Sequence, residues 1–271
     1  MKKFIAIVLL LTIALTAVSC SDTGGKLKKI QDAGEMVLYT APDFPPFEFP
    51  GANGIEGVDI ELAKAIADEL GVKLKIEEAE FESILMSMEG GKGDIAIAGV
   101  TITEGRKEKL DFSEPYIESF QYLILPEDSN IQFMEDLAGK KIGVAIGYTG
   151  NFVVDDEIKE GVLKATNATM SEYKNAMNAA LDIKAGRLDA VVMDEYVAKN
   201  IVATNAGLIS IQLKYKSGNA VAEEYGVVVP KGNEDLIEKI NAVIKRLKDE
   251  GKIQEWLVDF SRKLADKNEA E

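Results

Sequence analysis

Residues 91–99 read Gly-Lys-Gly-Asp-Ile-Ala-Ile-Ala-Gly, and residues 186–194 read Gly-Arg-Leu-Asp-Ala-Val-Val-Met-Asp. In each stretch a glycine ends a helical pattern, a basic residue and an aspartate follow, and an apolar strand runs to Gly99 or Asp194. The offset, from 91 to 186, is 95 residues, which is about the size of one small lobe. The repetition has two interpretations. Either an ordinary helix–turn–strand unit occurs twice, or two similar lobes face each other with their strand ends.

The pattern around these stretches is typical of α/β units built on a mostly parallel sheet. Short apolar strands alternate with helical patterns, and Asp59 and Gly71 have the residue types that begin and end a helix. We predict strands at 36–40, 73–77, 94–99, 121–125, 141–146, 188–193 and 226–229, and helices at 59–70, 81–89, 149–158, 171–185, 195–206, 234–250 and 253–264.

Ligands of open α/β sheets bind beyond the carboxyl ends of the strands. After the strand that ends at Gly99 come the hydroxyls of Thr101 and Thr103, and then Arg106. Thr103 is placed to cap a short helical turn. A guanidinium can hold a carboxylate through two hydrogen bonds, although a solitary arginine on a helix can equally be a solvated surface residue.

Two further strand ends carry candidate ligand-binding residues. Gly147, Tyr148 and Thr149 form a glycine turn before a helix, and free N–H groups at such a point suit a small anion or simply make a structural turn. Asp194 follows the second apolar strand, where it is either a helix N-cap or the partner of an ammonium ion.

Aromatic residues follow the first strand in a proline-rich loop. Pro45 and Pro46 prevent both helix and sheet ladder, so Phe44 is a candidate lid over a bound side chain, with Phe81 as its neighbour. The alternative is that these rings only fill the core.

The composition excludes several kinds of chemistry. The 271-residue chain has no His and one Cys, so it has no Ser-His-Asp system, no His-ligated zinc and no internal disulfide. We expect no metal and no cofactor. The net charge of −15 would repel a phosphate backbone, so we expect no nucleic-acid binding.

The N-terminus reads as an export signal. Residues 1–3 include two lysines, residues 4–18 are almost wholly apolar, and Cys20 follows them. The apolar stretch is shorter than the roughly 20 residues that span a bilayer. It resembles a bacterial lipoprotein signal, which implies a signal peptide at 1–19, acylation of Cys20 and a flexible tether at 20–29. The alternative is a plain secretory signal with an incidental cysteine.

Six motifs occur in an order that resembles the bacterial family 3 solute-binding proteins, the amino-acid-capturing components of ABC importers. They are residues 44–49 (Phe-Pro-Pro-Phe-Glu-Phe), 57–63 (Gly-Val-Asp-Ile-Glu-Leu-Ala), 98–106 (Ala-Gly-Val-Thr-Ile-Thr-Glu-Gly-Arg), 111–116 (Asp-Phe-Ser-Glu-Pro-Tyr), 189–194 (Asp-Ala-Val-Val-Met-Asp) and 224–226 (Glu-Tyr-Gly). The resemblance implies the type II periplasmic-binding-protein fold: two α/β lobes, each a mostly parallel sheet flanked by helices, joined by a two-strand hinge. Lobe 1 would comprise residues 30–116 and 226–271, and lobe 2 would comprise residues 122–221.

The resemblance also implies roles for the strand-end residues. Arg106, with the N–H groups of Thr101 and Thr149, would hold the ligand α-carboxylate. Asp194, the Gly99 carbonyl and the Thr101 hydroxyl would hold the α-ammonium. The ligand side chain would lie between Phe44 and Phe81. The implied partners are a free amino acid and an ABC permease, for a monomer held outside the cytoplasm by a lipid on Cys20.

Two departures from the family pattern bear on the ligand. Ala41 stands where relatives that take basic amino acids often have Asp, and Tyr148 stands where Thr is frequent, so we expect a polar or neutral amino acid. Two other functions remain open. One is a cyclohexadienyl or arogenate dehydratase on the same fold, with Glu48, Glu80, Glu82 or Glu223 as its acid. The other is a sensory amino-acid-binding protein.

Overall fold

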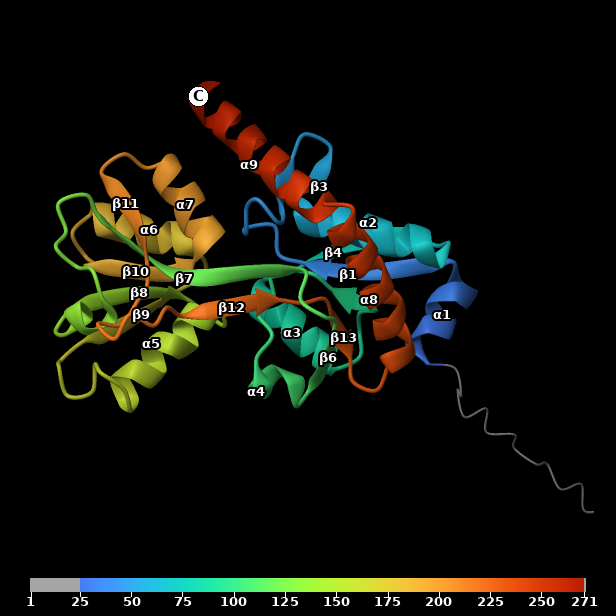
Figure 1. Ribbon diagram of the computed structural model, residues 1–271, viewed down its shortest axis with the longest axis horizontal. Coiled ribbons are helices and arrows are strands. Elements are labelled where there is room, and N and C mark those ends of the chain that lie inside the picture. Colours follow the sequence, from blue (N-terminus) through green and yellow to red (C-terminus); the bar gives the residue numbers. More distant parts are fainter. Residues whose placement is uncertain (1–24, 271) are drawn as a thin grey trace, which may run out of the picture.

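The computed structural model describes residues 25–270, which form two α/β lobes side by side (Figure 1). The signal peptide and the acylation of Cys20 therefore lie outside the described residues. Within residues 25–270, no helix has the length and apolar character needed to cross a bilayer.

The first lobe is built on a sheet with the strand order β4-β1-β5-β13-β6. β4 and β5 pair with β1 in parallel, whereas β13 pairs with its neighbours in antiparallel. Its strands are β1 (Glu35–Thr40), β4 (Lys73–Glu78), β5 (Ile95–Ala96), β6 (Leu110–Phe112) and β13 (Val228–Pro230), and a separate hairpin is formed by β2 (Phe49–Gly51) and β3 (Gly54–Glu56).

The second lobe is built on a sheet with the order β11-β7-β10-β8-β9. β8 pairs in parallel with β9 and β10, and β7 pairs in antiparallel with β10 and β11. Its strands are β7 (Ile117–Pro126), β8 (Lys141–Ala145), β9 (Thr169–Tyr173), β10 (Ala190–Asp194) and β11 (Leu208–Gln212). In each of these five-strand orders four strands run in one direction, and β13 in the first lobe and β7 in the second run opposite to them. The expected mostly parallel sheets are thereby confirmed.

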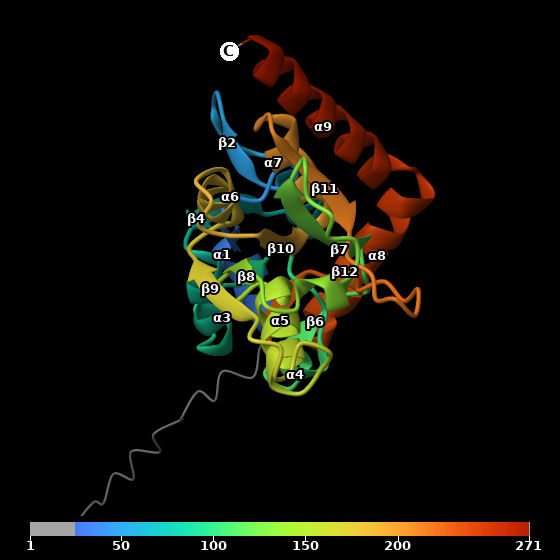
Figure 2. The ribbon, with the colours of Figure 1, turned by 90° about the vertical axis from the view of Figure 1, so that its left-hand side faces the viewer.

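Helices cover both sheets (Figures 1 and 2). Those of the first lobe are α1 (Lys26–Ala33), α2 (Val58–Leu70), α3 (Phe81–Glu89), α4 (Glu104–Lys107), α8 (Glu234–Asp249) and α9 (Lys252–Ala270). Those of the second lobe are η1 (Met134–Leu137), α5 (Thr149–Lys159), α6 (Ala176–Lys184) and α7 (Glu195–Ala203). The predicted helix at 81–89 is confirmed.

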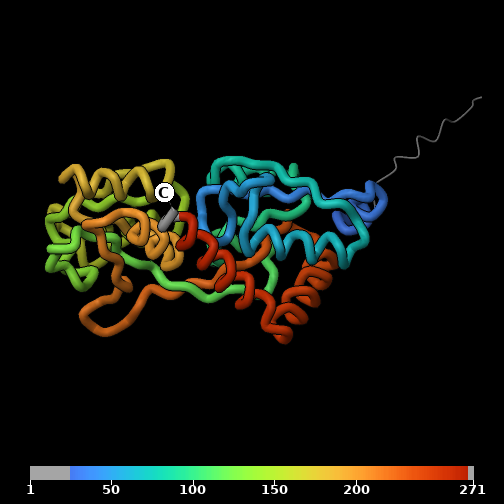
Figure 3. The backbone as a smooth tube through the Cα atoms, turned by 90° about the horizontal axis from the view of Figure 1, so that it is seen from above, coloured from blue at the N-terminus to red at the C-terminus, as the bar shows by residue number. Residues whose placement is uncertain are grey.

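Two strands join the lobes, as Figures 1 and 3 show. β7 runs from the first lobe into the second, and β12 (Ala222–Tyr225) returns in antiparallel beside its first half. The register pairs Ala222 with Phe120 and Tyr225 with Ile117. The two-lobed fold with a two-strand hinge is thereby confirmed.

The repeated stretches occupy equivalent places in the two lobes. The Asp94 carboxylate accepts a hydrogen bond of 2.8 Å from the Val37 N–H at the start of its parallel neighbour, β1. Asp189 accepts one of 2.7 Å from the Lys141 N–H at the start of β8. Because both aspartates tie the start of one strand to the next, the opposite ends of β5 and β10 bring Gly99 and Asp194 to the interlobe region.

Three local predictions are wrong, each for a physical reason. Asp59 does not cap α2, because Gly57 is the N-cap and the Asp59 side chain turns inward to accept from the Gly99 N–H at 2.9 Å. Residues 171–185 are not one helix, because β9 pairs with the edge of β8 before the Asn175 cap begins α6. Residues 26–29 are not flexible tether but the first turn of α1, which buries Ile30.

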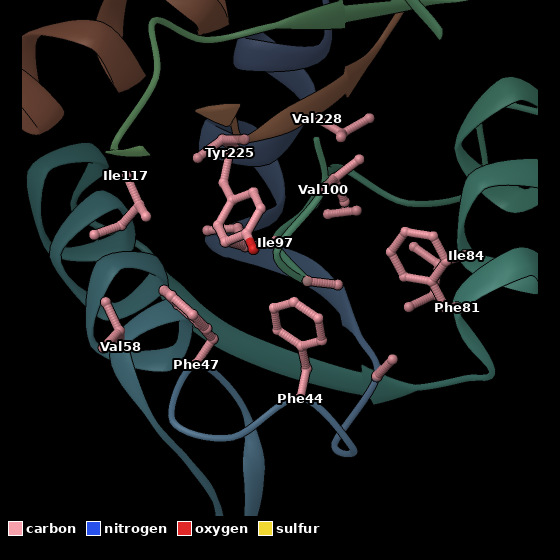
Figure 4. Close-up of a cluster of buried hydrophobic side chains, with 14 of the residues drawn as sticks. Phe44, Phe47, Val58, Phe81, Ile84, Ile97, Val100, Ile117, Tyr225 and Val228 are labelled. Atoms are coloured by element: carbon pink, nitrogen blue, oxygen red, sulfur yellow. The ribbon is translucent and has the colours of Figure 1, made fainter. Parts of the chain in front are cut away.

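The phenylalanine rings of the loop after β1 are buried rather than on the surface. Phe44 and Phe47 are 1% and 0% exposed, and both point toward Tyr225 of β12 (Figure 4). Their ring centroids lie 5.9 and 5.4 Å from that of Tyr225. The loop is thus packed against the strand that connects the two lobes.

Candidate ligand-binding site

The short helix after β5 positions Arg106. As predicted, Thr103 is the N-cap of α4, and its hydroxyl accepts from the Arg106 N–H at 3.2 Å. The guanidinium donates to the Thr101 carbonyl at 2.7 Å and, across the interlobe boundary, to the Gly147 carbonyl at 2.9 Å. It also lies over the Phe81 ring, 5.6 Å from the centroid.

Arg106 is a half-buried cation that faces the buried acids Asp194 and Glu223. Burial lowers the pKa of Arg106, and the nearby carboxyl groups of Asp194 and Glu223 act against that lowering. A guanidinium keeps its charge in proteins, so this cation is available to a carboxylate that enters between the lobes.

Asp194 lies at the end of β10 and is 1% exposed. Its Oδ1 accepts from Gln121 Nε2 at 2.6 Å, and its Oδ2 accepts from the Tyr225 hydroxyl at 2.9 Å. It occupies the N-cap position of α7 but makes no capping hydrogen bond with its side chain. Its carboxylate is therefore directed at the hinge strands and the interlobe region rather than at its own helix.

A chain of hydrogen bonds joins the two ends of the site. Thr149 at the start of α5 donates to the Thr101 hydroxyl at 2.8 Å, and Thr101 donates to Glu223 Oε2 at 3.1 Å. Gln121 Nε2 donates to the same Glu223 oxygen at 3.0 Å as well as to Asp194. Thr101 thus contacts the Arg106 guanidinium through its carbonyl and Glu223 through its hydroxyl. Glu223 in turn shares the Gln121 donor with Asp194.

The aromatic residues at the site stack around Tyr148. Its ring is nearly parallel to that of Phe81, with centroids 4.2 Å apart, and to that of Phe44, at 5.7 Å. The Tyr148 hydroxyl donates to Asp43 Oδ1 at 3.2 Å. Both lobes contribute to this cluster, since Tyr148 precedes α5 while the other residues come from the first lobe.

Gly99 needs to be glycine for two reasons. Its φ is +54°, in the left-handed region, and a Cβ at this position would lie 2.3 Å from the Phe44 ring. Any side chain here would displace Phe44 and, with it, the stack around Tyr148.

Two cavities of about 290 Å³ each lie beside the stack, and Asp43 lines both. One is mostly apolar and is bounded by Tyr148, Met193 and Leu264 among others. The other includes Glu78, Glu80 and Lys174. Space for a ligand side chain therefore lies on both sides of Asp43, although neither cavity is lined by Arg106 or Asp194.

All eight expected ligand-binding residues lie in this interlobe region: Phe44, Phe81, Gly99, Thr101, Arg106, Tyr148, Thr149 and Asp194. Sequence reasoning did not include Gln121, Tyr225 or Asp43, and it considered Glu223 only as an acid of the dehydratase alternative. The Glu-Tyr-Gly motif at 224–226 was the one signal close to Glu223. Within residues 25–270, no cluster of three or more His, Cys, Asp or Glu side chains has the arrangement of a metal site.

Two lobes joined by two strands, with a half-buried guanidinium on one lobe and a buried carboxylate on the other at the boundary between them, define a two-lobed solute-binding protein. Residues 36–261 match the family described as bacterial extracellular solute-binding proteins, family 3, and the chain belongs to that family.

Individual relatives agree with this membership. The chain is 29% identical to the arginine-binding extracellular protein ArtP of Bacillus subtilis (94% of this chain, 96% of ArtP). It is 31% identical to the ABC transporter glutamine-binding protein GlnH of the same organism (94% and 96%). Among solved structures, it resembles the amino acid ABC transporter substrate-binding protein AbpA of Streptococcus pneumoniae bound to L-arginine, with 33% identity, a TM-score of 0.80, and coverage of 88% of this chain and 99% of AbpA. The names of these relatives describe binding proteins, not enzymes.

Proposed function

We propose that this protein captures a free amino acid between its lobes and delivers it to the permease of an ABC importer. The observation that carries the proposal is that one chain of hydrogen bonds joins Arg106 to Asp194: Arg106 donates to the Thr101 carbonyl, and the Thr101 hydroxyl is linked to Asp194 through Glu223 and Gln121. A guanidinium at one end and a carboxylate at the other match the two charges of an amino acid.

Closure of the lobes supplies the affinity in this proposal. Arg106, with the N–H groups of Thr101 and Thr149, holds the α-carboxylate, while Asp194, the Gly99 carbonyl and the Thr101 hydroxyl hold the α-ammonium. Exclusion of water strengthens each charge-assisted hydrogen bond. Each is worth about 1.5–3 kcal/mol net, and a Kd of 1 μM requires about 8 kcal/mol. Residues 30–116 with 226–271 and residues 122–221 would move as the two lobes.

The side chain of the ligand has two candidate classes. Ala41, which carries no charge, favours a polar or neutral side chain. Asp43 and Glu78 around one of the cavities favour a basic side chain, whereas Glu80 there is paired with Lys174. ArtP is named as an arginine-binding protein, and the AbpA structure is bound to L-arginine. In either class, Phe44 and Phe81 would flank the ligand side chain.

A thermal-shift screen against the twenty amino acids tests the proposal. Binding raises the free energy of unfolding by RT ln(1 + [L]/Kd), about 2.7 kcal/mol at 100 times Kd. The ligand should raise the Tm more than the other amino acids do. A rise with L-glutamine would indicate the neutral side-chain class, and a rise with L-arginine the basic one. If none of the twenty raises the Tm, free amino acids are not the ligand.

The dehydratase alternative has its own measurement. Purified protein incubated with prephenate or arogenate would form phenylpyruvate or phenylalanine if the protein were such an enzyme. A sensory role would be separated from transport by stimulation of the cognate transporter's ATPase in proteoliposomes, which only a transport component provides.

The lipid anchor is tested separately. Acylation of Cys20 predicts that the full-length protein fractionates with membranes as a monomer, and that Cys20→Ala releases it or leaves it unprocessed. Processed protein that is absent from the membrane fraction and carries no lipid, by mass spectrometry, would leave only the plain secretory signal.

A further inference from the structure

Two buried carboxyl groups, Asp194 and Glu223, share their hydrogen-bond donors. They are 1% and 5% exposed, and Gln121 Nε2 donates to Asp194 Oδ1 at 2.6 Å and to Glu223 Oε2 at 3.0 Å. None of the ion pairs found within residues 25–270 involves either group. Two buried carboxylates so placed would repel each other without a compensating cation.

The contacts of the Tyr225 phenol favour a proton on Glu223. Its oxygen has three oxygen neighbours: Asp194 Oδ2 at 2.9 Å, Ser119 Oγ at 3.2 Å and Glu223 Oε1 at 3.3 Å. A phenol has one hydrogen, and the shortest of these contacts takes it to Asp194. The Ser119 hydroxyl can donate its own hydrogen to the phenol, whereas Glu223 Oε1 can do so only if it is protonated.

The other groups that face the pair agree with one proton held on it. Arg106 of α4 is a cationic side chain that interacts with both carboxyl groups, and Tyr148 and Tyr225 provide neutral phenols. Thr101 and Gln121 provide neutral donors to Glu223. Burial raises the pKa of Glu223 well above its usual value, and the charge of Asp194 raises it further. Burial also raises the pKa of Asp194, against the hydrogen bonds from Gln121 and Tyr225.

We infer that Glu223 is a further ligand-binding residue, and that the α-ammonium of an incoming amino acid takes the place of the proton that Asp194 and Glu223 share. The inference rests on the proposed function of the site. An ammonium group beside the pair favours the charged form of both carboxyls. Glu223 then releases its proton to the buffer. The Glu223 carboxylate accepts a hydrogen bond from the ammonium group or from the neighbouring Thr101 hydroxyl.

Binding is therefore linked to the release of up to one proton. The association constant rises with pH, by up to tenfold per pH unit, between the pKa of Glu223 in the liganded protein and its higher pKa in the unliganded protein. Above and below this range the association constant does not change with pH. Glu223→Gln mimics the protonated carboxyl, since an amide can donate to Asp194, but it has no proton to release.

Calorimetry with L-arginine and with L-glutamine tests the inference. In wild type, the apparent enthalpy of binding should differ between phosphate and Tris buffers by the number of protons released times the difference in the two ionisation enthalpies. The affinity should rise with pH up to the pKa of Glu223 in the unliganded protein. In Glu223→Gln both dependences should be absent. The matched control is Glu224→Gln, because Glu224 is the exposed neighbour on the same strand and should behave as wild type. Binding without buffer dependence in wild type overturns the inference and leaves the proposed function intact.

A second measurement needs no ligand. Glu223 has a raised pKa in the folded protein, so the stability associated with its protonated form is present at low pH and is lost as pH rises through that pKa. Wild type should thus lose stability relative to Glu223→Gln between pH 5 and pH 9 in urea unfolding. If neither amino acid binds, the proposed function fails for them. A stability difference between the two proteins that is independent of pH refutes the shared proton in that case too.

Discussion

Tyr148 stacks on Phe81 with their ring centroids 4.2 Å apart and their planes 20° from parallel. The two residues belong to different lobes, so the stack forms only when the lobes are together. Tyr148 is 4% exposed, and it occupies space next to the ring that is proposed to flank the ligand side chain. The Tyr148 ring therefore limits the space that is left for the ligand side chain.

Replacing Tyr148 by Thr should enlarge the side-chain site. We expect Tyr148→Thr to bind L-arginine several-fold more tightly relative to L-alanine than wild type does, because the removed ring frees space beside Phe81 and Phe44. Isothermal calorimetry with the two amino acids measures the ratio. Tyr148→Phe is the matched control, since it keeps the stack and loses only the hydrogen bond to Asp43. An unchanged ratio in Tyr148→Thr would show that the ring does not border the ligand side chain.

Arg106→Lys should abolish most ligand binding while the fold persists. A lysine ammonium keeps the charge but lacks the planar fork that reaches both the Thr101 and Gly147 carbonyls. Loss of one charge-assisted pair costs about 3 kcal/mol, roughly a 100-fold weaker Kd. Calorimetry measures the Kd, and circular dichroism checks the fold.

The control for this substitution is Arg187→Lys. Arg187 is an exposed arginine that pairs with Asp182 on the surface of the second lobe, and we expect no change in affinity. Asp194→Asn should match Arg106→Lys in its loss of binding. Wild-type affinity in a folded Arg106→Lys protein would remove Arg106 from the ligand site.

Much of the site could be predicted because it lies at strand ends. Gly99, Thr101 and Arg106 follow one apolar strand and Asp194 ends another, and the equivalent roles of Asp94 and Asp189 show why the repeated stretches place them alike. Local pattern was sufficient there, since a strand followed by a polar turn is visible in the sequence.

Glu223 and Gln121 could not be predicted in the same way. They lie within the hinge strands, far apart in the sequence. The hydrogen bond between Gln121 and Glu223 depends on how β12 is paired with β7, which no local pattern shows. Asp59 was misjudged for a related reason. Its residue type fits a helix cap, but burial under Gly99 is decided by tertiary packing. The polar edge strand β9 likewise carries no alternation that marks it as a strand.

The buried pair of Asp59 and Glu48 should make stability depend on pH. Burial raises the pKa of Asp59 from 3.8 to about 6 and that of Glu48 well above 4.5. For a raised pKa, the stabilising contribution is complete below the unfolded-state pKa and is lost as pH rises through the folded-state value. Wild type should therefore lose stability between pH 4 and pH 8, by about 3 kcal/mol for Asp59.

Asp59→Asn should remove most of this loss. The amide oxygen can still accept from Gly99 and Tyr116, and the amide nitrogen can donate to Glu48 in place of the hydrogen bond between the two carboxyl groups. Urea unfolding of both proteins across this pH range measures the difference. Asp68→Asn, at an exposed position of the same helix, is the control. Equal pH profiles of wild type and Asp59→Asn would mean that Asp59 titrates normally.

The C-terminal helix should stabilise the closed arrangement of the lobes. α9 packs on α2 and α8 of the first lobe and also contacts α7 of the second (Figure 1). Leu264, which is half-buried, lines both the apolar cavity beside Tyr148 and a smaller one against α7. Leu264→Ser should weaken ligand affinity several-fold without altering either lobe, because it removes an apolar contact that exists only when the lobes meet. Val258→Ser, at a 52% exposed position on the same helix, should leave the Kd unchanged.

Small-angle scattering at subsaturating ligand should show a larger fraction of open molecules for Leu264→Ser. Identical affinity of the two variants would mean that α9 does not contribute to closure.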